Sequence, residues 1–135
     1  NGVPVKPGLR ELLAWLKQAH ILCAVATSTF TNVAIGYLKN AGVLNCFAAI
    51  VGGDQVTKSK PDPEIFQLAM RALGKQTPET CVVFEDSRNG LLAGANGGFP
   101  VIVVPDLFDP TLELPGLCYA KCARLDEAID VIQNS

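Results

Sequence analysis

The sequence lacks the features that mark several large classes of protein. Its 135 residues include one methionine, one tryptophan and one histidine, and only 18% of them are charged. It has no run of Lys and Arg that could neutralise a nucleic-acid backbone, and its formal charge is -2. Its longest apolar runs, such as residues 101–104, are far too short to cross a bilayer. We therefore expect neither nucleic acid nor a membrane among its partners.

The cysteines form no recognisable disulfide or zinc pattern. The sequence has five of them, scattered and without a CxxC pair: Cys23, Cys46, Cys81, Cys118 and Cys122. Cys118 and Cys122 are four residues apart, but no histidine or second pair completes a zinc set. We expect buried or inert thiols and a location in the reducing cytoplasm.

Helical and strand-like segments alternate along the whole chain. Leucines at positions 9, 12, 13 and 16 have the spacing of an amphipathic helix that begins just after Pro7. Further helices are predicted at residues 30–40, 62–73, 87–96 and around 125–132. Short apolar runs predict buried strands at residues 21–26, 47–51, 81–84 and 100–104, with a loop at 105–115. This alternation predicts an α/β fold, a Rossmann-like doubly wound parallel sheet.

Polar residues follow three of the predicted strands, at the edge where such sheets bind ligands. Thr27 and Ser28 come after the first strand and suit a phosphate cradle, although both residue types are also ordinary helix caps. Lys60 follows the second strand and could neutralise a phosphate or a carboxylate, although most loop lysines are only solvated. Glu85 and Asp86 follow the third, where Mg²⁺ could compensate them; alternatively, Asp86 caps a helix and Glu85 faces solvent.

Taken together, these three segments resemble the haloacid dehalogenase (HAD) superfamily. The similarity is to the branch that contains beta-phosphoglucomutase and phosphoglycolate phosphatase. Residues 24–28 match the second motif, residues 59–66 the third, and residues 83–87 with Gly90 the fourth. The resemblance runs over essentially the whole chain.

The resemblance implies a Mg²⁺-dependent phosphatase or phosphomutase that acts on a small phosphorylated metabolite through an aspartyl phosphate. Thr27 and Lys60 would then be the catalytic residues. Thr27, helped by the backbone of Ser28, would bind the transferring phosphoryl group. Lys60 would neutralise charge between that group and the nucleophile. Asp86 would bind Mg²⁺, with Glu85 as a second ligand or as a partner of a metal-bound water. These roles agree with the physics of phosphoryl transfer, which depends on positioning and charge stabilisation.

The family's first motif and its helical cap have no counterpart here. The first motif is a DxD-type segment whose leading aspartate is the nucleophile, and residues 3–9 resemble the return from the cap. We expect residues 1–135 to be the C-terminal portion of a single HAD-like core domain without its first, central strand. That strand would lie between those predicted at 21–26 and 81–84. The chain starts at Asn1 and its only methionine is Met70, as expected of a fragment.

Such a chain is expected to be inactive alone and to leave two strand edges unpaired. The missing N-terminal segment, with nucleophile strand and cap, or another chain would complete the sheet.

The same residues allow three other interpretations. A phosphorylation-receiver domain uses similar residues, but its acidic pair precedes the hydroxyl and the lysine, the reverse of the order here. A nucleotide-binding Rossmann domain lacks support because neither GxGxxG nor GxxxxGK[ST] occurs. A non-catalytic interaction or regulatory module that kept the HAD scaffold remains open as the alternative function.

Overall fold

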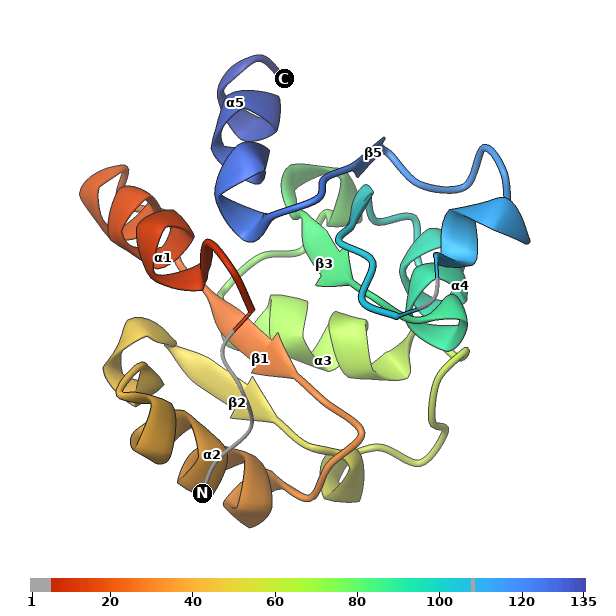
Figure 1. Ribbon diagram of the computed structural model, residues 1–135. Coiled ribbons are helices and arrows are strands. Elements are labelled where there is room, and N and C mark those ends of the chain that lie inside the picture. Colours follow the sequence, from red (N-terminus) through yellow and green to blue (C-terminus); the bar gives the residue numbers. More distant parts are fainter. Residues whose placement is uncertain (1–5, 108) are drawn as a thin grey trace.

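The chain alternates helices with parallel strands, as its sequence predicts (Figure 1). The computed structural model describes residues 6–107 and 109–135, so part of the expected return from a cap, residues 3–5, lies outside the described residues. The helices are α1 (Leu9–Gln18), α2 (Thr31–Ala41), α3 (Glu64–Ala72), α4 (Arg88–Asn96) and α5 (Ala128–Gln133). The strands are β1 (Ala24–Ala26), β2 (Ala49–Val51), β3 (Val83–Glu85), β4 (Val101–Val103) and β5 (Ala120–Lys121).

The sheet is divided into two parts. β1 pairs with β2, Val25 opposite Ile50, while β3, β4 and β5 form the other part, Phe84 opposite Ile102. Every one of these pairings is parallel. Within the described residues no strand joins β1 to β3, which is where the sequence places the missing central strand. The predicted fold class, a doubly wound core without that strand, is therefore confirmed.

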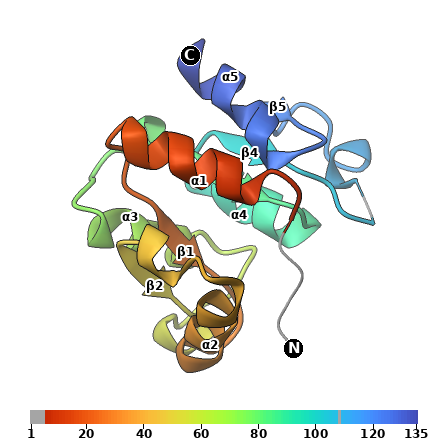
Figure 2. The ribbon, with the colours of Figure 1, turned by 60° about the vertical axis from the view of Figure 1, so that its left-hand side comes forward.

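Helices cover both faces of the strands. α3 packs on β1 and β2, and α4 packs on β3 and β4, around a buried cluster that includes Phe66, Leu91 and Val101. On the opposite face α1 and α5 lie against each other (Figure 2) and form a second cluster around Leu12 and Ile102. Alternate residues of β4 thus enter opposite clusters, as in a strand covered on both faces.

The expected helices are all present, with small differences at their ends. α1 buries the predicted leucine face, and α2 ends at Gly42, which has a positive φ of 75°. Pro63 is the N-cap of α3 rather than its first residue, because the helix begins at Glu64. Asp62, one residue before this N-cap, accepts a hydrogen bond through its Oδ1 from the Glu64 N–H at 3.0 Å.

The strands differ more from the expectation. β1 includes only the last three residues of its apolar run, and Leu22 before it is 60% exposed. β3 extends one residue further than predicted and ends on Glu85. β5 is missing from the sequence prediction, because two residues give no periodicity to detect.

The cysteines form no disulfide among the described residues. All five cysteines, each within the described residues, are free thiols, and burial raises the pKa of Cys23 and Cys122. Only Cys122 is buried; Cys23, Cys81 and Cys118 are partly buried, and Cys46 is exposed. Across residues 6–107 and 109–135, no helix combines the length and the apolar character needed to cross a membrane.

Candidate active site

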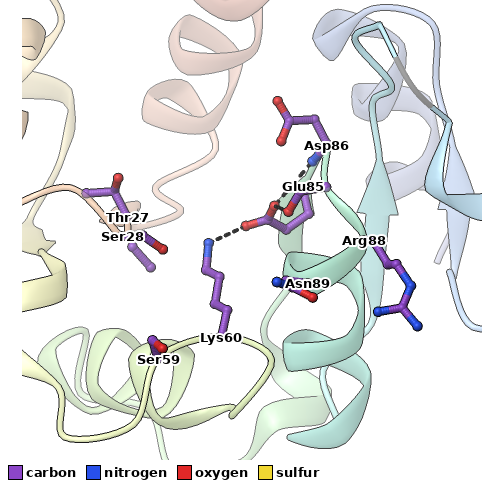
Figure 3. A pocket seen from close by; sticks show the side chains of 10 residues that line it. Thr27, Ser28, Ser59, Lys60, Glu85, Asp86, Arg88 and Asn89 are labelled. Carbon is purple, nitrogen blue, oxygen red and sulfur yellow. Dashed lines mark hydrogen bonds and ion pairs between the residues drawn. The ribbon is translucent and has the colours of Figure 1, made fainter.

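The carboxyl ends of β1 and β3 open onto one cavity of about 810 Å³ (Figure 3). All the residues singled out from the sequence border it: Thr27, Ser28, Lys60, Glu85 and Asp86. They come from three segments that are far apart in the sequence, as the strand-end argument predicts. Figure 3 shows the hydroxyl pair on one side of the cavity and the acidic pair on the other, with the lysine between them.

Backbone hydrogen bonds hold the loop after β1 against the loop after β2. The Thr27 N–H donates to the Val51 carbonyl at 2.9 Å, and the Gly53 N–H donates to the Thr29 carbonyl at 2.8 Å. The Thr27 hydroxyl accepts from the Thr29 N–H at 3.1 Å, so its own hydrogen can be donated to a ligand. Gly53 lies so close to the Ser28 carbonyl that a Cβ there would overlap it.

Asp54 also fixes this loop, which the sequence analysis did not foresee. Its Oδ1 accepts from the Thr31 N–H at 2.7 Å and from the Thr31 hydroxyl at 2.8 Å, at the start of α2. These bonds hold the pKa of the Asp54 carboxyl below its usual value, the backbone bond most strongly. The Gly52-Gly53-Asp54 sequence could have predicted this contact. The glycines allow another backbone segment to approach closely, and the aspartate can accept hydrogen bonds from the start of a helix.

The loop that carries Lys60 is anchored to α3 in a similar way. The Glu64 carboxylate accepts from the Lys58 N–H at 2.8 Å and from the Thr57 N–H at 3.1 Å. These donors, first Lys58 and then Thr57, lower the pKa of the Glu64 carboxyl. The start of α3 therefore fixes the segment from which the lysine extends.

Lys60 forms the most buried ion pair of the described residues. Its Nζ lies 2.7 Å from Glu85 Oε2, and the two side chains are only 12% and 9% exposed. The same Nζ lies 5.0 Å from the centroid of the Phe66 ring, a cation–π contact. Both charges were expected at the site from the sequence, but their direct pairing was not.

Asp86 is in a different environment from its neighbour. Its side chain is 41% exposed, and its nearest charged partner is Lys6, with Nζ 3.4 Å from Oδ2. Figure 3 shows its carboxylate pointing away from that of Glu85. The two adjacent carboxylates therefore differ both in burial and in the lysine with which they pair.

Asp86 fits part of a magnesium site. Within the described residues no group of three or more His, Cys, Asp or Glu side chains gathers as a ready-made metal cage. Mg²⁺, however, commonly takes one or two carboxylates and completes its shell with waters and substrate phosphate. Asp86 offers an accessible carboxylate of that kind at the border of the cavity.

Three further residues line the cavity without having been predicted: Ser59, Arg88 and Asn89. Arg88 extends away from the centre (Figure 3), with its Nε 3.5 Å from Glu113 Oε1. Ser59 opens the segment that matches the third motif, whereas no motif residue falls on Arg88 or Asn89. All three line the cavity because they neighbour Lys60 in the loop or form the first turn of α4.

The fold and the cavity together define a domain of the doubly wound α/β class with polar residues gathered at the ends of its strands. The chain belongs to the haloacid dehalogenase-like hydrolase family, whose model matches residues 1–98. Its relatives place it in the branch of beta-phosphoglucomutase and phosphoglycolate phosphatase-like proteins, as the motifs predict.

Individual relatives agree with this assignment. The chain is 42% identical over 92 residues to the phosphorylated carbohydrates phosphatase of Thermotoga maritima, covering 68% of this chain and 42% of the relative. It is 38% identical over 117 residues to protein CbbY of Cereibacter sphaeroides, covering 84% and 50%. A crystal structure of CbbY from Rhodobacter sphaeroides in complex with phosphate superposes with a TM-score of 0.81 at 34% identity, covering 91% and 55%.

A Thermotoga maritima structure assigned as a beta-phosphoglucomutase has a TM-score of 0.83 at 35% identity and covers 95% of this chain and 59% of its own. The chain thus spans about half the length of the curated relatives that it matches. The remaining length of those proteins has no counterpart in these residues.

Proposed function

We propose that this chain supplies the phosphate-binding and metal-binding half of a Mg²⁺-dependent phosphohydrolase. The observation that carries the proposal is the cavity that Thr27, Lys60 and Asp86 all border. A hydroxyl and an ammonium stabilise phosphoryl oxygens, and a carboxylate recruits the cation that phosphoryl transfer needs. The phosphohydrolase function of the family supports this assignment.

Each of these residues has a proposed part in binding. The Thr27 hydroxyl and the Ser28 backbone hold the phosphoryl group, and Lys60 balances its charge. Asp86 would hold Mg²⁺, with Glu85 beside it, and the cation would supply further charge neutralisation for the phosphoryl oxygens. The substrate class is a small phosphorylated metabolite, in keeping with the phosphorylated-carbohydrate phosphatase among the relatives.

The nucleophile and the central strand are proposed to come from outside these 135 residues. Cys23 and Thr27, the residues that flank β1, form backbone hydrogen bonds to the β2 side. The backbone groups of Ala24 and Ala26 therefore point to the opposite edge of β1. On β3, the bonds of Val83 and Glu85 to the β4 side similarly leave the groups of Phe84 for the other edge. A parallel strand between these edges would pair with both and end at the cavity.

We therefore propose that residues 1–135 are the C-terminal portion of one core domain and are inactive alone. The strand, with its aspartate, would come from an N-terminal segment or another chain. Intact mass spectrometry of the natural protein, compared with its gene, tests the first source. A gene product that begins at Asn1 would exclude it and leave a second chain as the supplier.

The function is tested by phosphate release from a panel of small phosphomonoesters, using the longest product of the gene. We expect turnover that requires Mg²⁺ and is abolished by Thr27→Val, Lys60→Met or Asp86→Ala. Calorimetry with inorganic phosphate on the 135-residue chain provides a second readout, because Lys60→Met should weaken binding. Turnover by none of the esters, with equal phosphate binding by wild type and variant, would favour the non-catalytic module instead.

A further inference from the structure

Glu85 differs from Asp86 because both of its carboxylate oxygens are already engaged. Oε2 accepts from Lys60 Nζ at 2.7 Å. Oε1 accepts from the Ser87 hydroxyl at 3.1 Å and from the Asp86 N–H at 3.3 Å. The side chain is 9% exposed, so a carboxylate with three donors and little water has limited capacity for another cation.

Gly90 controls where this carboxylate can lie. It is a buried residue in the first turn of α4, and its N–H donates to the Ser87 hydroxyl at 3.0 Å. A methyl group built on Gly90 would overlap the carboxyl carbon and Oε1 of Glu85. The obstructing atoms are the far end of a flexible side chain, whereas the turn is fixed by its cap. A larger residue at position 90 would therefore displace the carboxylate rather than the helix.

Lys60, the other member of the ion pair, is held by fewer contacts than Glu85. Lys60 reaches Glu85 from a loop across the cavity (Figure 3), and its other close contact is the Phe66 ring. The direction of its ammonium therefore depends on where the Glu85 carboxylate is seated.

We propose that Gly90 is a positioning residue that acts through Glu85. By leaving room for the carboxylate, and by binding the Ser87 hydroxyl that donates to it, Gly90 seats Glu85 where Lys60 is its partner. Lys60 is thereby directed into the cavity, and Asp86 is the carboxylate left for a cation. This inference rests on the proposed function in one respect, namely that the ligand of Lys60 is a phosphoryl group.

The test is the rate at which an amine-reactive reagent such as acetic anhydride labels Lys60, followed by mass spectrometry. The labelling rate of exposed Lys58 measures the effective dose of the reagent. In a separate experiment, the rate at which iodoacetamide modifies buried Cys122 measures global unfolding of the chain. We expect Gly90→Ala to raise the Lys60 rate several-fold while both references stay unchanged. Gly36→Ala is the matched control, because no atom outside its own helix neighbourhood lies within 4 Å of the new methyl.

A double-mutant cycle separates positioning from a general structural effect. Glu85→Ala should raise the Lys60 rate by itself, and adding Gly90→Ala should then change nothing, because there is no carboxylate to displace. An unchanged Lys60 rate in Gly90→Ala, a parallel rise at Cys122, or additive effects in the cycle would each overturn the proposal.

Glu85→Gln keeps the test decisive if Gly90→Ala does not fold. It preserves the size of the side chain and removes its charge, so Lys60 labelling should rise. A wild-type rate in this variant would show that Glu85 does not hold the lysine. Labelling requires no turnover, so an absence of phosphatase activity would not affect the labelling result. Likewise, an unchanged labelling rate would overturn the role of Gly90 without affecting the test of phosphatase activity.

Discussion

The two parts of the divided sheet bury similar apolar strands to very different depths. In β4, which has a strand on either side, Val101, Ile102 and Val103 are all 0% exposed. In β1, which pairs with β2 alone among the described strands, every residue is only partly buried. An apolar run therefore predicts which residues favour burial, but the extent of their burial depends on the neighbouring strands.

Loss of the Lys60–Glu85 pair should have the largest effect, because this pair links the two parts. Lys60 precedes α3, which packs on β1 and β2, whereas Glu85 belongs to β3. Lys60→Met leaves a buried carboxylate without its cation, so we expect the free energy of unfolding to fall by about 3 kcal/mol. Urea denaturation measures it, with Lys58→Met as the exposed control. Equal losses in the two variants would contradict the special role of the buried pair.

A matched pair of valine deletions tests the difference in burial directly. Val103→Ala removes two methyl groups from a fully buried site in β4, and we expect a loss of roughly 2 kcal/mol. Val25→Ala makes the same deletion in half-buried β1, and we expect a loss below about 1 kcal/mol. Chemical denaturation under identical conditions compares the two. Equal losses of stability would contradict the inference that Val25 is packed less tightly than Val103.

The loops that follow β1 and β3 provide a smaller contrast. Ser87 caps α4 by accepting from the Gly90 N–H, so Ser87→Ala should cost about 1 kcal/mol of stability. Ser28 follows β1 and is not the cap of α2, so Ser28→Ala should change stability by less than about 0.5 kcal/mol. Thermal unfolding of both variants measures the contrast. A larger loss from Ser28→Ala would reverse it.

Acid pH should affect both parts by the same mechanism and with the smallest amplitude. Hydrogen bonds from Thr31 lower the pKa of Asp54, and hydrogen bonds from Thr111 and then Lys121 lower that of Asp109. A lowered folded-state pKa gives stability that is complete above the ordinary carboxylate range and is lost as pH falls through the folded value. Asp54→Asn and Asp109→Asn should therefore each flatten the acid decline in urea midpoint. A decline parallel to that of wild type would contradict the assigned bonds.

The alternation of elements and the convergence of the motif residues could be predicted because both depend on local pattern. Apolar spacing predicts α1, and the ends of parallel strands must share an edge, which brings Thr27, Lys60 and Asp86 together. The Lys60–Glu85 pairing could not be foreseen, because the two residues are 25 positions apart and the contact depends on how α3 and β3 pack.

The division of the sheet was inferred from what the motif list lacked, whereas the details of its edges required coordinates. The apolar run 21–26 predicts a strand covered on both faces, yet only Ala24–Ala26 forms one, and Leu22 is largely exposed. β5 escaped prediction because its two residues owe their conformation to pairing with β4 rather than to their own pattern.

The edges of β1 and β3 that no described strand covers also have a consequence for the chain in concentrated solution. Backbone groups directed outward from β1 and β3 can template the pairing of a second copy as readily as that of an intended strand. A formal charge of -2 provides little mutual repulsion between copies. We expect light scattering to record self-association that grows with protein concentration and recedes once a complementary strand is supplied.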